Sequence, residues 1–150
     1  MQLPSHIQKR LDDFWQDNKG EEHEEQWPAG NTYTNHWESP TYMLPLGDPK
    51  LKGGGSELQK ILLDSVQTTL EAWTGQSLVF TSSYGIRIYK EDAVLSPHID
   101  RLPLVTSAIV NVAQNVDEPW VLELIGHNGG ATNGKGPIMF RLSLLYHILT

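Results

Sequence analysis

His98 and Asp100, in the second half of the chain, are of types that bind metals and are separated by one residue, Ile99. Alternate side chains of a β-strand project from the same face, so an imidazole nitrogen and a carboxylate oxygen would point the same way. With a second histidine from a distant strand, they would form the two-histidine, one-carboxylate face that binds Fe(II) in non-haem oxygenases. A His-x-Asp triplet alone is a weak signal, and the alternative is a hydrogen-bonded pair at a strand edge.

The residues around this pair predict a β-rich second half. Five segments rich in β-branched and aromatic residues are separated by turn residues: 78–80, 84–89, 94–99, 105–112 and 121–125. A polar hairpin turn is predicted at residues 90–92. Short strands are also expected at 32–37 and 41–44, within a region rich in proline, glycine and aromatic residues.

The first of two predicted helices spans residues 5–19. Ser5 can cap it, and Gln8 stands at the third position of a capping box. The Asn-Lys-Gly sequence at 18–20 is a stop signal.

The second predicted helix begins with the capping pattern Ser56 and Gln59 and ends at Gly75. Apolar residues at steps of three and four predict one buried face, formed by Leu58, Ile61, Leu62, Val66, Leu70 and Trp73. Helices followed by a succession of short strands indicate an α+β domain whose sheet curls or closes.

Composition limits the class of protein. A chain of 150 residues is enough for one domain, and a net charge of −7 opposes binding to nucleic acid. The absence of cysteine excludes disulfides, cysteine-bound zinc and thiol nucleophiles. The N-terminus lacks the apolar core of a signal peptide and no stretch is long enough to cross a membrane, so a soluble protein is expected, cytoplasmic by default.

Acidic residues gather after the first helix. Four glutamates predict a solvated linker rather than a metal site: Glu21, Glu22, Glu24 and Glu25. His6 and His23, which flank the first helix among charged residues, are expected at the surface.

The wider sequence around His98 carries more information than the triplet. Tyr89 stands nine residues before His98, Pro97 directly precedes it, and RLPLVTSAIVNVAQNVDEPW follows Asp100. With the upstream blocks WPAGNTYTNHWESPTYM and EAWTGQ, these features resemble the prolyl 4-hydroxylase-like branch of the 2-oxoglutarate and Fe(II)-dependent dioxygenases, over roughly residues 5–130. The resemblance implies one domain over residues 1–150. Residues 1–75 would be a helical and irregular support for a β-rich core at 76–150, a double-stranded β-helix (jelly roll) whose final strands are missing.

The resemblance also implies the chemistry. Fe(II) and 2-oxoglutarate are the expected cofactors, with ascorbate as an optional third. Decarboxylation of 2-oxoglutarate to succinate would accompany hydroxylation of a C–H bond. The substrate would be peptidyl proline by resemblance, although a small molecule is equally compatible with the residues.

Several residues beside the triplet gain roles from this resemblance. Tyr89 matches a tyrosine that lies near the cosubstrate, with cross-strand aromatic packing as the alternative. Arg87 has the same strand parity as Tyr89 and could face the same cavity. Arg101 has the opposite parity to the triplet, which favours a place away from the metal. Asn111 and Gln114 are candidates for the cavity edge or simply for strand ends.

The second histidine of the metal site is the open question. In the family it lies about fifty residues beyond the aspartate and is followed by a basic residue that anchors 2-oxoglutarate. The resemblance ends near Gly129, and His147 is the substitute candidate at the required separation. A buried histidine without a metal role is the alternative there, and Arg141 could replace the anchor only in an altered strand register. His36 and His127 are further candidates, each more easily explained as a loop residue.

Two other functions remain open at this point. The chain could be an inactive jelly-roll module that binds a protein partner through its aromatic N-terminal segment and an exposed sheet edge. It could also be a cupin-like metalloprotein that uses His98, Asp100 and His127 without 2-oxoglutarate. Asn35, Trp37 and Tyr42 are candidates to line a substrate groove.

Overall fold

The computed structural model describes residues 3–26, 39–95, 104 and 106–117 with their side chains, and the backbone of residues 122–125, 131–134 and 140–148. The candidate ligands His98 and Asp100 lie outside the described residues, as do His36, Arg101 and His127. Within the described part, no helix combines the length and apolarity needed to cross a bilayer.

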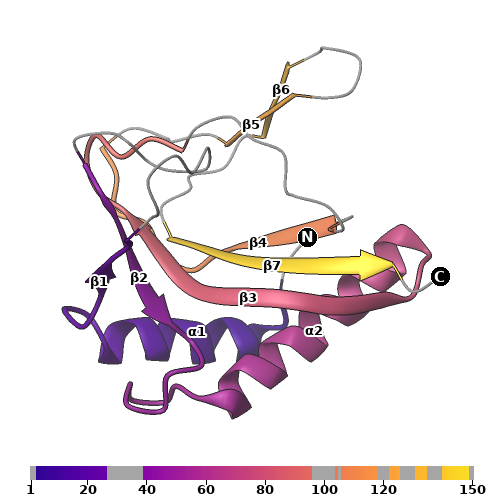
Figure 1. The fold of residues 1–150 in the computed structure, drawn as a ribbon, viewed down its shortest axis with the longest axis horizontal. Helices are drawn as coiled ribbons and strands as arrows, with labels where there is room; N and C mark the ends of the chain where they lie inside the picture. Colours follow the sequence, from indigo (N-terminus) through magenta and orange to yellow (C-terminus); the bar gives the residue numbers. More distant parts are fainter. Residues whose placement is uncertain are drawn as a thin grey trace.

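Two helices and an antiparallel sheet confirm the α+β class. The sheet has five strands in the order β1 (His23–Glu24), β2 (Thr41–Pro45), β3 (Leu78–Tyr89), β7 (Phe140–Ile148) and β4 (Thr106–Asn111). A separate pair joins β5 (Leu122–Ile125) to β6 (Ala131–Gly134). The helices α1 (Ser5–Asp17) and α2 (Ser56–Thr74) lie on one side of the five-stranded sheet, and the β5–β6 pair is on the other (Figure 1).

The helix α1 forms where it was predicted, because its apolar residues recur at helical spacing. It buries Ile7, Leu11, Phe14 and Trp15. The expected capping box is wrong: Ser5 is already helical, and Pro4 is the N-cap with φ −52°. The fixed φ of proline suits a helix start, and the Pro4 carbonyl accepts hydrogen bonds from the backbone N–H groups of Ile7 and Gln8 at 2.9 and 3.1 Å.

Asn18 ends α1 and joins it to a distant loop. Its Nδ2 donates to the carbonyl of Phe14 at 2.7 Å and to that of Lys52 at 3.0 Å, and its Oδ1 accepts from the Lys52 backbone N–H at 2.9 Å. The side chain is buried, so these three bonds satisfy groups that water cannot reach.

The helix α2 spans the residues expected and ends at Gly75, which takes the left-handed conformation with φ 67°. Its buried residues are Leu58, Leu62, Val66 and Leu70. Trp73, predicted on the same face, is 69% exposed because it stands in the last turn, where the chain leaves the helix. The capping pattern is again wrong: Gly55 is the N-cap, and the Gln59 side chain donates instead to Ser83 Oγ at 2.6 Å.

Polar side chains at the end of α2 bind the first residue of β3. The Glu71 carboxylate accepts the Leu78 backbone N–H at 2.8 Å and the Gln67 amide at 3.1 Å, and that amide also donates to the Leu78 carbonyl at 2.7 Å. The hydrogen bond from Leu78, and after it the one from Gln67, holds the pKa of Glu71 below its ordinary value of 4.5.

The strand β3 is one continuous element, although the sequence predicted two shorter strands. It runs through register irregularities between Phe80 and Ser82 and between Ser83 and Ile86. Gly85 lies at the second of these, where a Cβ atom would stand 2.1 Å from the Leu44 carbonyl oxygen. Only glycine permits β2 to approach β3 this closely. The predicted turn follows β3, with the Ala93 N–H bonded to the Lys90 carbonyl and Asp92 at φ 62°.

The C-terminal tail, which the sequence left without a place in a jelly roll, forms the strand β7. This strand lies between β3 and β4 and is antiparallel to both. In the described structure, β3 and β4 are therefore joined through β7.

The hydrophobic core lies between the helices and one face of the sheet. Leu44, Ile86, Ile88 and Val110 contribute to it from the strands. Because alternate strand residues point to opposite faces, Met43, Arg87 and Tyr89 belong to the face turned away from the helices.

Candidate functional site

The face of β2 and β3 turned away from the helices carries buried polar residues. Thr41 and Tyr89, paired across the two strands, are 5% and 3% exposed. Arg87, two residues before Tyr89 and paired with Met43, is 17% exposed at its side chain. Burial of a guanidinium and a phenol on one sheet face demands partners for both groups.

Glu25 provides the partner for Arg87. The Arg87 Nε donates to Glu25 Oε2 at 2.7 Å, and Nη2 donates to Oε1 at 2.8 Å, so both carboxylate oxygens are engaged by one guanidinium plane. The Glu25 side chain is only 9% exposed, so its predicted place in a solvated linker is wrong. Glu21 and Glu24 are exposed as expected, and so are His6 and His23.

The backbone explains why Glu25 differs from the other glutamates. β1 pairs with β2, and just beyond it the Glu25 N–H donates to the Thr41 carbonyl at 2.9 Å. This places the Glu25 side chain over β2, where Thr41 Oγ1 donates to Glu25 Oε2 at 2.6 Å. Thr41, Glu25 and Arg87 thus form a chain of hydrogen bonds from three segments.

Tyr89 joins this network through Arg87. Burial would lower the pKa of Arg87, but its hydrogen bonds to Glu25 and its electrostatic interaction with Tyr89 outweigh that effect, and the net direction is a raised pKa. A guanidinium is not deprotonated in proteins, and these interactions favour its charged form further. Sequence parity had placed Arg87 and Tyr89 together, but nothing in the sequence pointed to Glu25 or Thr41.

One row of paired positions crosses all five strands at this level. It runs from His23 through Met43, Arg87 and Arg141 to Asn111. Two arginine positions therefore face each other directly in the β3–β7 ladder.

His147 lies far from this row. It pairs with Val79, ten residues before Tyr89, which is roughly 30 Å along an extended strand. The structure therefore does not place His147 in one site with Arg87 and Tyr89.

The remaining candidates are surface or packing residues in the described chain. Asn111 and Gln114 are both exposed. Tyr42, expected in a groove, packs against the core instead, and its ring lies 3.8 Å from Lys90 Nζ in a cation–π contact. Asn35 and Trp37 lie outside the described residues.

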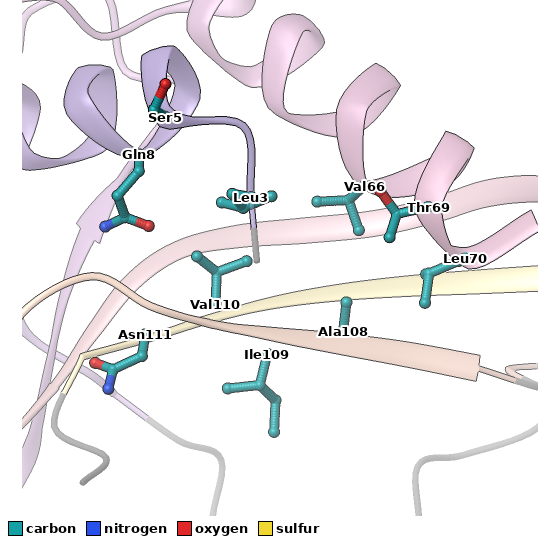
Figure 2. A pocket seen from close by; sticks show the side chains of 10 residues that line it. All are labelled: Leu3, Ser5, Gln8, Val66, Thr69, Leu70, Ala108, Ile109, Val110 and Asn111. Carbon is teal, nitrogen blue, oxygen red and sulfur yellow. The ribbon is translucent and has the colours of Figure 1, made fainter. Parts of the chain in front are cut away.

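A groove of about 530 Å³ lies on the helix side, between the start of α1, the middle of α2 and β4 (Figure 2). Its apolar lining comes from Leu3, Val66, Leu70, Ala108, Ile109 and Val110, and its polar lining from Ser5, Gln8, Thr69 and Asn111. None of these ten side chains is ionisable, so the groove offers no histidine or carboxylate ligand for a metal and no charge for an ionic substrate.

Among the described residues, no three histidine or acidic side chains gather in a way that could hold a metal ion. No protein-family model, no curated protein and no solved structure matches the chain. The buried network of Thr41, Glu25, Arg87 and Tyr89 is thus the strongest candidate for a functional site in the described structure.

Proposed function

We propose that the chain is an Fe(II)- and 2-oxoglutarate-dependent dioxygenase of the prolyl 4-hydroxylase type, with the sheet forming part of a double-stranded β-helix. The observation that carries the proposal is the buried guanidinium and phenol on the sheet face away from the helices. Both groups belong to residues of β3, and His98 follows Tyr89 by nine residues in the sequence. A buried polar sheet face is costly for a purely structural sheet and useful for binding an ionic cosubstrate.

Each residue has a defined role in this proposal. His98 and Asp100 hold Fe(II), and the Tyr89 hydroxyl donates to a carboxylate of 2-oxoglutarate. When bound, Fe(II) and 2-oxoglutarate would supply, with dioxygen as the oxidant, the chemistry that places one oxygen atom in a C–H bond and the other in succinate, with release of carbon dioxide. The protein residues bind and orient these groups and exclude water.

Three of the sequence-based assignments change within this proposal, those of Arg87, Arg141 and His147. Arg87 directs two nitrogens at Glu25, so it supports Tyr89 rather than binding 2-oxoglutarate itself. Arg141 is the better candidate for the basic anchor, because its position pairs directly with that of Arg87. For the third ligand we favour His36 or His127 over His147, because His147 pairs with Val79, roughly 30 Å along β3 from Tyr89.

Anaerobic titration of the purified chain with Fe(II) and 2-oxoglutarate tests the proposal. A visible metal-to-cosubstrate charge-transfer band is expected in the wild type and should be lost in His98→Ala and Asp100→Ala. His147→Ala is the matched control and should keep the band, whereas the one of His36→Ala and His127→Ala that loses it identifies the third ligand. A folded wild-type chain without any band would contradict the proposal and favour a non-catalytic binding module.

A further inference from the structure

The Arg87 side chain is fixed in both direction and plane. Its Nε and Nη2 donate in parallel to the two oxygens of Glu25, an arrangement that a single hydrogen bond could not impose. The pair is largely buried, with side-chain exposures of 17% and 9%, so water cannot readily replace either partner.

The carboxylate of Glu25 is itself held from a second direction. Thr41 Oγ1 donates to Oε2 at 2.6 Å, and the backbone bond from Glu25 N–H to the Thr41 carbonyl fixes where the side chain starts. The position of the Arg87 guanidinium is therefore set by β2 and by the short segment after β1, rather than by β3 alone.

Tyr89 stands where this arrangement can act on it. It pairs directly with Thr41 across β2 and β3, lies two residues beyond Arg87, and interacts electrostatically with the guanidinium. Glu25 and Tyr89 therefore both interact with one guanidinium on the same face of the sheet. A shift of the carboxylate would be passed to the phenol through one rigid planar group.

We propose that Glu25 and Arg87 are positioning residues that hold the Tyr89 hydroxyl in place for the carboxylate of the cosubstrate, with Thr41 as their support. This inference rests on the proposed function. It assigns a functional role to Glu25 and thus to the short segment after β1, which would otherwise only cover the sheet.

The test compares substitutions along the network by two readouts. The first is the ring signal of Tyr89 in NMR spectra of tyrosine-labelled protein without metal. It is expected to shift in Glu25→Gln and Thr41→Val, to return towards wild type in Thr41→Ser, and to stay unchanged in Asp17→Asn. Asp17 is a suitable control because its ion pair with Lys52 is exposed and lies outside the network.

The second readout is the 2-oxoglutarate concentration that gives half-saturation in the anaerobic titration. Glu25→Gln is expected to raise this concentration about tenfold, because loss of a residue that orients a binding group commonly has an effect of that size. The Fe(II) concentration at half-saturation should be unchanged. Added to Tyr89→Phe, the same substitution should have little further effect, because both act through one hydroxyl.

The outcomes separate this inference from the proposed function. If wild type binds 2-oxoglutarate but Glu25→Gln and Thr41→Val behave like Asp17→Asn in both readouts, the positioning role is refuted and the dioxygenase proposal stands. If wild type shows no response to 2-oxoglutarate, the dioxygenase proposal fails and the positioning role fails with it.

Discussion

The ion pair between Arg87 and Glu25 allows a quantitative test of how this sheet face is stabilised. Both side chains are largely buried and joined by two hydrogen bonds. Removing one partner leaves the other as a buried, uncompensated charge, which typically costs about 3–5 kcal/mol. Arg87→Met and Glu25→Leu are each expected to reduce the free energy of unfolding by that amount, a large part of the total of about 5–15 kcal/mol usual for a domain.

The double variant distinguishes a true pair from two independent losses. Because two apolar side chains of similar size leave no buried charge, the double variant should lie within about 1–2 kcal/mol of wild type. Urea unfolding, followed by circular dichroism, provides the free energy of unfolding of each variant. The dependence of this free energy on urea concentration is compared between variants to exclude changes in the unfolded state. The exposed pair Lys9–Asp13 is the control, and its removal should produce no measurable coupling.

Losses below about 1 kcal/mol in both single variants would refute the reasoning, because such values are typical of solvated pairs. Additive losses in the double variant would also contradict it, since they would mean that the two side chains do not depend on each other.

Further predictions concern the frame of the site. Gly85→Ala should destabilise the protein by at least about 2 kcal/mol, because the added methyl group meets the β2 backbone, whereas Gly47→Ala, which meets only a flexible side chain, should be nearly neutral in the same urea unfolding assay. Asn18→Ala, measured in the same way, should lose about 2–4 kcal/mol, because the three hydrogen bonds of this buried side chain disappear. A chain stopped after residue 139 should lack a cooperative unfolding transition and aggregate on size-exclusion chromatography, because β3 and β4 lose their shared partner. The folded-state pKa of Glu71 lies below its ordinary value of 4.5. The stability that its carboxylate contributes is therefore present above pH 4.5 and is lost as the pH falls through the folded-state pKa. The difference in Tm between wild type and Glu71→Gln should shrink below pH 4.5.

Local patterns in the sequence predicted the local elements well. The apolar periodicity located α1 and α2, Gly75 ended α2, and β-branched and aromatic residues located β2 and β4 to within about two residues. The predictions of the two helix N-caps were wrong for a local reason. A proline or a glycine one residue upstream takes the N-cap conformation, and the serine becomes the first helical residue.

Long-range pairing accounts for what the sequence did not reveal. Glu25 stands among exposed glutamates and differs from them only through Arg87, which is 62 residues away. The tail shows no strand signature strong enough to predict that it would form an interior strand of the sheet, because that place depends on β3 and β4 together. Parity along β3 did place Arg87 and Tyr89 on one face, but it could not show that Arg87 is already occupied by a carboxylate.

The most direct test of the proposed site is a crystal structure of the chain grown without dioxygen in the presence of Mn(II), in place of Fe(II), and 2-oxoglutarate. The metal is expected on His98 and Asp100, with a carboxylate of 2-oxoglutarate within hydrogen-bond distance of the Tyr89 hydroxyl and Arg87 still paired with Glu25. A metal bound elsewhere, or a cosubstrate bound away from Tyr89, would contradict this proposal.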